Sequence, residues 1–174
     1  MNQPERPRVV IGPSGAGKTA LAEALTRVNS RFELVLTHTT RPRRPREGAT
    51  HVFVTDPEFD STPYLGTLSI FGARYGLPNF ATGRTPLILL RLAALDQFAP
   101  LYPNAFVIQV EASVDTLIER LAQRGDLVRA DPEALREETL RGREVASAIV
   151  QTDTPFSQSL DRFAAAATSL SVVS

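Results

Sequence analysis

The stretch that most constrains the fold lies near the start of the chain and reads VVIGPSGAGKTAL over residues 9–21. Apolar residues of β type run into a glycine-rich turn, which ends in Lys18, Thr19 and an apolar helical start. The spacing Gly12-x-x-x-x-Gly17-Lys18-Thr19 matches the P-loop pattern G-x-x-x-x-G-K-[ST]. We therefore expect an α/β protein in which a strand, a phosphate-binding loop and a helix follow one another.

Each fixed position of this loop has a chemical reason. Glycines let the backbone turn tightly, so that successive N–H groups can point at phosphate oxygens. Lys18, the only lysine among nineteen basic residues, brings a mobile charge to the β- and γ-phosphates, and Thr19 offers a hydroxyl to Mg²⁺. The predicted phosphate-binding residues are Gly12, Pro13, Ser14, Gly15, Ala16, Gly17, Lys18 and Thr19.

Length and composition favour one compact domain over residues 1–174. The formal net charge is zero, so no global field favours nucleic acid or a membrane. Cysteine is absent, which excludes disulfides and thiol catalysis. The N-terminus is not built as a signal peptide, and no apolar run is long enough for a membrane span. We expect a cytoplasmic protein, a monomer or a homodimer, without nucleic-acid or membrane partners.

Periodicity predicts the other elements of a parallel sheet. Apolar spacing indicates a helix behind the loop over 19–28 and a closing helix over 157–167, and apolar runs indicate strands at 32–37, 87–90, 105–110 and 148–153. A helix capped by Ser113 should end at Gly125, and another should start at Asp131-Pro132. Arg120 and Arg124 lie one turn apart on the first of these helices, so we expect both to reach toward the same anion. Arg91, at the carboxyl end of a strand, is either a surface arginine or a phosphate ligand.

An arginine-rich segment follows the second strand. Arg41, Arg43, Arg44 and Arg46 alternate with prolines that keep the backbone extended. Such a run by itself is equally a solvated loop or a nucleic-acid patch. Its position one strand after a P-loop favours a second phosphate site, in which guanidinium groups grip a phosphate monoester.

Taken together, these motifs resemble guanylate kinases. The order is GPSGAGKT, a T-x-T-T-R-P-x-R-P-x-E run over 37–47, HVFVT, FGARYG and an R-L-x-x-R-G element over 120–125. The resemblance implies a P-loop nucleoside-monophosphate-kinase-like three-layer sandwich with a parallel core sheet. Its core would comprise residues 7–36, 84–125 and 145–168, with an acceptor-binding insertion at 37–83 and a lid at 126–144.

The resemblance also implies roles for single residues. ATP would be the phosphoryl donor, with Mg²⁺ on Thr19 and adenine against Gln151. Lys18 and the lid arginines Arg124, Arg136 and Arg141 would be catalytic. A small phosphorylated acceptor, a nucleotide or a sugar phosphate, would bind Thr37, Arg41, Arg44, Glu47, His51 and Tyr75.

Departures from the family pattern fall on the acceptor and metal side. Gly66 and Leu89 stand where the family places the two carboxylates that read guanine, and Arg91 stands where another acid is expected. Without those carboxylates, guanine recognition should be weak. A ribose 1,5-bisphosphate phosphokinase, which resembles a guanylate kinase without base-reading carboxylates, is the alternative, and His51 resembles that enzyme.

Two classes of function fit the sequence. The first is a P-loop kinase that moves the γ-phosphoryl of ATP to a phosphate-bearing acceptor. The second is a catalytically inactive nucleotide-binding or protein-interaction module. The missing acids at 89 and 91 favour the module, whereas the Lys18-Thr19 pair favours the kinase.

Overall fold

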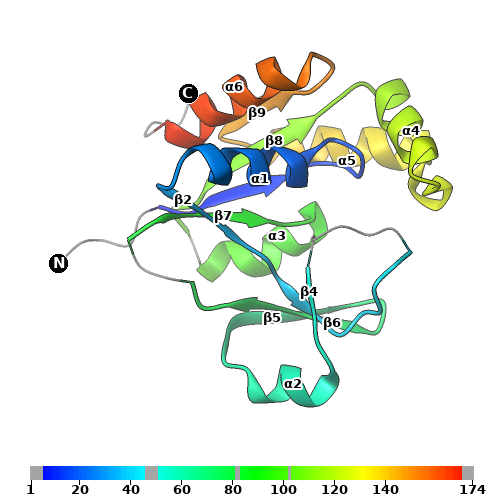
Figure 1. Ribbon diagram of the computed structural model, residues 1–174. Coiled ribbons are helices and arrows are strands. Elements are labelled where there is room, and N and C mark those ends of the chain that lie inside the picture. Colours follow the sequence, from blue (N-terminus) through cyan, green and yellow to red (C-terminus); the bar gives the residue numbers. More distant parts are fainter. Residues whose placement is uncertain (1–5, 46–50, 81–82, 102, 170–174) are drawn as a thin grey trace.

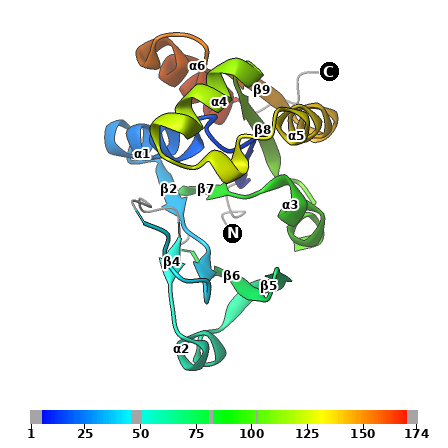
Figure 2. The same cartoon turned by 90° about the vertical axis from the view of Figure 1, so that its right-hand side faces the viewer.

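The computed structural model describes residues 6–45, 51–80, 83–101 and 103–169. Its centre is a parallel sheet with the strand order β2-β7-β1-β8-β9. These strands are β1 (Arg8–Ile11), β2 (Phe32–Val35), β7 (Thr85–Leu89), β8 (Phe106–Glu111) and β9 (Ala148–Gln151). Helices α1 (Lys18–Val28) and α6 (Phe156–Thr168) cover one face of this central sheet, while α3 (Leu92–Phe98) and α5 (Pro132–Val145) cover the other (Figure 1 and Figure 2). The predicted three-layer α/β architecture is confirmed.

The predicted strands and helices are present with small shifts at their ends. The strand expected over 32–37 ends at Val35, because the chain then leaves the central sheet and enters a second one. Ser113 caps α4 (Val114–Gln123), its hydroxyl accepting a hydrogen bond from the Thr116 N–H at 3.3 Å. Asp131 caps α5 in the same way, with Pro132 in the first turn.

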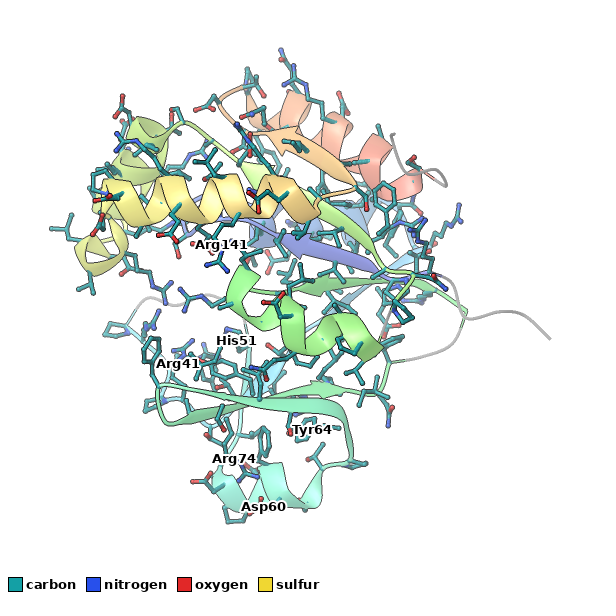
Figure 3. All side chains as sticks on the ribbon, turned by 180° about the vertical axis from the view of Figure 1, so that it is seen from behind. Arg41, His51, Asp60, Tyr64, Arg74 and Arg141 are labelled. Atoms are coloured by element: carbon teal, nitrogen blue, oxygen red, sulfur yellow. The ribbon has the colours of Figure 1, made fainter. Side chains whose placement is uncertain are left out.

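The second sheet is small and lies on the side of α3 away from α1 and α6 (Figure 1). Its strand order is β4-β3-β6-β5, with the strands β3 (His38–Thr39), β4 (Val52–Phe53), β5 (Tyr64–Ile70) and β6 (Ala73–Pro78). Helix α2 (Asp56–Ser61) begins with a capping box formed by Thr55 and Glu58. Arg74 of β6 holds α2 through Asp60 at 2.5 Å and Asp56 at 3.4 Å, and Figure 3 shows Arg74 and Asp60 side by side.

Two separate apolar cores hold the layers together. One joins the central sheet to α1, α4 and α6 and includes Leu25, Phe106 and Phe163. The other joins the opposite face of the central sheet to α3 and to the small sheet, which contributes Leu68 and Leu77. The small sheet is therefore attached to the central sheet through the α3 core, as apolar burial requires.

Residues 126–144 were expected to form a mobile, charged lid. They begin with a short 3-10 helix, η2 (Leu127–Arg129), and continue into α5, which lies against β8 and α3. Leu135 of α5 is buried, and a Cβ at Gly142 would meet the Gln109 side chain of β8 at 2.3 Å. This helix is thus packed on the sheet, and the lid role remains a prediction. Within the described ranges, none of the helices is long and apolar enough to cross a membrane.

Candidate active site

The glycine-rich loop turns between β1 and α1 as the motif predicts. Gly12 has a φ of 141°, and a Cβ there would lie 2.0 Å from the Val110 carbonyl oxygen of β8. Gly15 has a φ of 87°, and a Cβ there would lie 3.2 Å from the Leu117 carbonyl oxygen of α4. A side chain at Gly12 would combine backbone strain with a clash, and one at Gly15 would combine strain with a tight contact. These glycines let the loop sit directly on β8 and α4, at the carboxyl end of the central sheet.

Lys18 lies folded over this loop. Its Nζ donates hydrogen bonds to the carbonyl oxygens of Gly12 at 2.5 Å and Pro13 at 2.9 Å. Burial lowers the pKa of Lys18 to about 8; the negative charge of Glu138 opposes this shift, and the positive charges of Arg91 and Arg124 add to it. An ammonium group held this way needs an anion to stabilise its charge, which suits a phosphate ligand.

Arg120 and Thr152 support the loop from outside. Arg120 donates to the Gly15 carbonyl at 3.2 Å and to the Thr152 hydroxyl and carbonyl at 3.0 and 2.6 Å. The Thr152 hydroxyl donates in turn to the Ala16 carbonyl at 2.9 Å. The helical spacing predicted that Arg120 and Arg124 reach one anion together, and this is wrong, because Arg120 is committed to backbone and Thr152. Of these two arginines, Arg124 lines the cleft beside the loop.

A cleft of about 190 Å³ lies between the loop and the small sheet. It brings together most of the residues predicted from the sequence. On the loop side they are Gly12, Ser14, Gly15, Gly17, Lys18, Thr19 and Arg124, and on the side of the small sheet they are Arg41, Arg44, His51 and Tyr75. Pro13 and Ala16 do not line the cleft and act through the loop backbone, since Ala16 N–H donates to the Pro13 carbonyl at 3.3 Å.

The side of the cleft formed by the small sheet has an ordered polar arrangement. Thr37 Oγ1 and His51 Nδ1 share a hydrogen bond of 2.7 Å, and Thr37 is buried. The His51 ring meets the Tyr75 ring edge-on, with 5.7 Å between centroids. Arg41 lies over the Phe53 ring at 5.3 Å. Glu47, also predicted here, lies outside the described residues.

Of the other predicted residues, Thr37, Arg136, Arg141 and Gln151 do not line the cleft. Arg136 is exposed on α5, and Arg141 has a side chain 62% exposed with the Glu137 carboxylate 4.0 Å away. Figure 3 places Arg141 on α5, on the other side of the α3 ribbon from Arg41 and His51. Gln151 is exposed at the end of β9 and donates a hydrogen bond to Glu111. Their catalytic and adenine-binding roles remain predictions.

Glu111 explains why another α5 arginine is unavailable. This carboxylate is buried at the end of β8 and accepts hydrogen bonds from Arg143 Nε at 2.9 and 3.1 Å and from Nη2 at 2.6 Å. The pair raises the pKa of Arg143 through this hydrogen bonding and charge attraction. The contacts of Arg143 thus fasten α5 to β8.

Apolar side chains surround Gly66, one of the two positions at which the resemblance placed a carboxylate that reads guanine. A side chain at Gly66 would meet Leu101 at 2.5 Å and Phe98 at 3.2 Å. A cavity of only about 30 Å³ lies between the small sheet and α3 and is lined mainly by apolar residues such as Leu89. A space of this size suits water molecules rather than a purine.

Sequence reasoning missed several charged residues of the cleft. Asp126, Arg129 and Glu138 line it, and the Asp126 carboxylate lies 3.5 Å from Arg129 Nε. Arg91, left undecided by the sequence, lines both this cleft and the small cavity. For Glu138 the helical spacing from Leu135 was an available signal, since residues three apart share a face.

Comparison with known proteins decides the family. The guanylate kinase family model matches residues 4–72. A guanylate kinase of Thermobifida fusca (strain YX) is 32% identical, covering 87% of this chain and 86% of that protein. The chain belongs to the guanylate kinase family. A second member, from Coxiella burnetii (strain RSA 493 / Nine Mile phase I), is 31% identical over 76% of this chain and 68% of its own length.

The fold of this guanylate kinase family member agrees with a solved structure. The guanylate kinase from Anaplasma phagocytophilum superposes with a TM-score of 0.65, at 18% identity, covering 95% of this chain and 85% of that one. The chain is accordingly a P-loop phosphotransferase with a nucleotide-binding loop, as its motif predicted.

Proposed function

We propose that this kinase transfers the γ-phosphoryl of ATP to a small acceptor that already carries a phosphate, and that it reads guanine weakly. The acceptor is a nucleoside monophosphate such as GMP, or a ribose phosphate. The single observation that carries the proposal is the cleft with cations on both sides. Lys18 and Arg124 face it from the core, and Arg41 and Arg44 face it from the small sheet.

This arrangement suits phosphoryl transfer, which depends on positioning and charge neutralisation rather than on a strong base. The loop N–H groups and Lys18 would hold the phosphates of ATP, while Arg41, Arg44 and Tyr75 would hold the phosphate of the acceptor. The hydroxyl of Thr19 lines the cleft and is the kind of oxygen ligand that Mg²⁺ prefers, so the donor set fits the ion. Magnesium, when bound, neutralises charge on the β- and γ-phosphates.

Weak guanine recognition rests on the apolar region beside β5. Gly66 has no side chain and Leu89 has an apolar one, so neither position supplies the hydrogen-bond acceptor that reading guanine would need. Each missing charged hydrogen bond costs roughly 1.5–3 kcal/mol, so two of them predict a loss of about two to four decades in guanine preference.

The test is kcat/KM for GMP, AMP, dGMP and ribose 1,5-bisphosphate at fixed ATP and Mg²⁺. Lys18→Met is the activity control and should abolish transfer, since it removes a phosphate charge without removing core packing. We expect no strong preference for GMP over AMP. A preference of about a thousandfold would refute weak guanine reading, because it would require an intact set of base contacts.

The alternative acceptor, ribose 1,5-bisphosphate, is supported by His51 and Arg91, which add polar and cationic groups to the lining of the cleft and of the small cavity. The same assay separates the two acceptors by their relative kcat/KM. Absence of ADP release with every acceptor, from an enzyme that still binds ATP, would instead support the inactive nucleotide-binding module.

A further inference from the structure

Among the described residues, one carboxylate lines the cleft without a hydrogen bond or an ion pair to another side chain. Of the carboxylates that line it within the described ranges, Asp126 faces Arg129 at 3.5 Å. Glu138 lines the same cleft, and no hydrogen bond or ion pair joins it to another described residue. It is also the acid whose charge acts on Lys18.

The packing of α5 explains why Glu138 faces the cleft. Leu135, Glu138 and Gly142 follow the i, i+3, i+7 spacing of one helical face. Leu135 is buried, and Gly142 lies so close to β8 that a Cβ would meet Gln109 at 2.3 Å. Leu135 and Gly142 are therefore held against the sheet, and Glu138, which lies between them, is directed toward the carboxyl end of the sheet.

The charges around Glu138 make its position informative. Lys18, Arg91 and Arg124 surround a place suited to phosphates, and a carboxylate there would repel them. A cation between carboxylate and phosphate turns this repulsion into attraction. Mg²⁺ is commonly bound by one or two carboxylates together with substrate phosphates, so a single acid is sufficient.

Resting on the kinase function proposed above, we propose that Glu138 supplies the carboxylate of the magnesium–nucleotide site, opposite the hydroxyl of Thr19. The strand-end positions 89 and 91 carry leucine and arginine and have no acid to contribute. The structure brings a carboxylate from α5 to the cleft instead. Contact with the ion is direct or through its bound waters, both of which are usual for Mg²⁺.

The test measures metal binding rather than turnover. Mn²⁺ binding to the enzyme–ADP complex is followed by electron paramagnetic resonance in the parent, Glu138→Gln and Glu137→Gln. Glu137 is the matched control, since it is the adjacent acid on α5, exposed and near Arg141. We expect Glu138→Gln to weaken Mn²⁺ binding about tenfold or more, as loss of a group that orders a metal site does, and Glu137→Gln to leave it unchanged.

A parallel titration with ADP and a chelator separates the metal role from a simple counter-ion role. Metal-free ADP should bind Glu138→Gln as well as the parent or more tightly, because a repulsive charge is gone. Unchanged Mn²⁺ affinity in Glu138→Gln, or in Glu138→Ala as a second removal of the carboxylate, would overturn the assignment and make Glu138 a counter-ion of Lys18. No acceptor is present, so failure here is distinct from failure of the proposed acceptor class.

Discussion

Lys18 should take up a proton when a nucleotide binds. Burial, reinforced by Arg91 and Arg124 and opposed by Glu138, lowers its pKa to about 8 in the ligand-free loop. Phosphate oxygens beside Nζ favour the charged form, so binding should return the pKa to its ordinary 10.5 or above. At alkaline pH, Lys18 is therefore deprotonated in a fraction of the free enzyme molecules, and these must take up a proton to bind the nucleotide.

The magnitude follows from these two pKa values. Binding should take up about half a proton per site at pH 8 and about 0.9 at pH 9, and ADP affinity should fall about tenfold from pH 7 to pH 9. The free energy of unfolding depends on pH with the opposite sign to ADP affinity. Between about pH 8 and 10.5 the unfolded chain holds the Lys18 proton and the ligand-free folded chain does not, so this group makes the free energy of unfolding rise with pH.

Calorimetric titration of ADP in two buffers of different ionisation enthalpy measures the proton uptake directly. Metal is left out, so the readout concerns the lysine alone. Lys18→Arg is the matched control, because a guanidinium remains charged throughout this pH range and should show no uptake. Equal uptake by parent and variant at pH 9, or a parent affinity that is flat from pH 7 to 9, would refute a lowered pKa at Lys18.

Two further predictions concern the acceptor side and the α5 packing. Arg44→Ala should lower kcat/KM for the acceptor by a factor equivalent to about 2 kcal/mol or more, with ATP affinity nearly unchanged. Arg43 lies over the Phe53 ring outside the cleft, so Arg43→Ala is the control and should have little effect. Equal weakening of both substrates by Arg44→Ala would place Arg44 elsewhere. Gly142→Ala should destabilise the fold by about 1–2 kcal/mol net, because the overpacking of its Cβ against Gln109, about 2–3 kcal/mol, exceeds the gain of about 1 kcal/mol in helix propensity. An unchanged midpoint in urea unfolding would contradict this.

The loop half of the site was predictable because its contacts are local in sequence. A glycine spacing, one lysine and one threonine fix the geometry between β1 and α1, and the structure reproduces it at Gly12, Gly15 and Lys18. The supporting contacts of Arg120 to Gly15 and Thr152 join segments far apart in sequence. A local sequence pattern cannot indicate contacts between distant segments, so Arg120 was predicted to bind an anion.

The contacts of α5 could not be predicted from the sequence for a related reason. Its composition is charged with few apolar residues, which is typical of a solvated segment. Two of its charges are nonetheless specific: Arg143 binds the buried Glu111, and Glu138 lines the cleft. Close packing at a glycine brings this helix to the sheet, and glycine in mid-helix is normally counted against structure. The strands of the small sheet were likewise hard to recognise, because β3 and β4 are only two residues long.

The division into two apolar cores has a consequence for how this molecule opens locally. Leu68 and Leu77 share their core with Leu95 and Phe98 of α3, whereas the helix behind the loop belongs to the other core. Cooperative opening units tend to follow such clusters. Backbone amides of β5, β6 and α3 should then exchange with solvent deuterium as one group, and those of α1, α4 and α6 as another. The acceptor half can thus loosen while the nucleotide half keeps its amide protection.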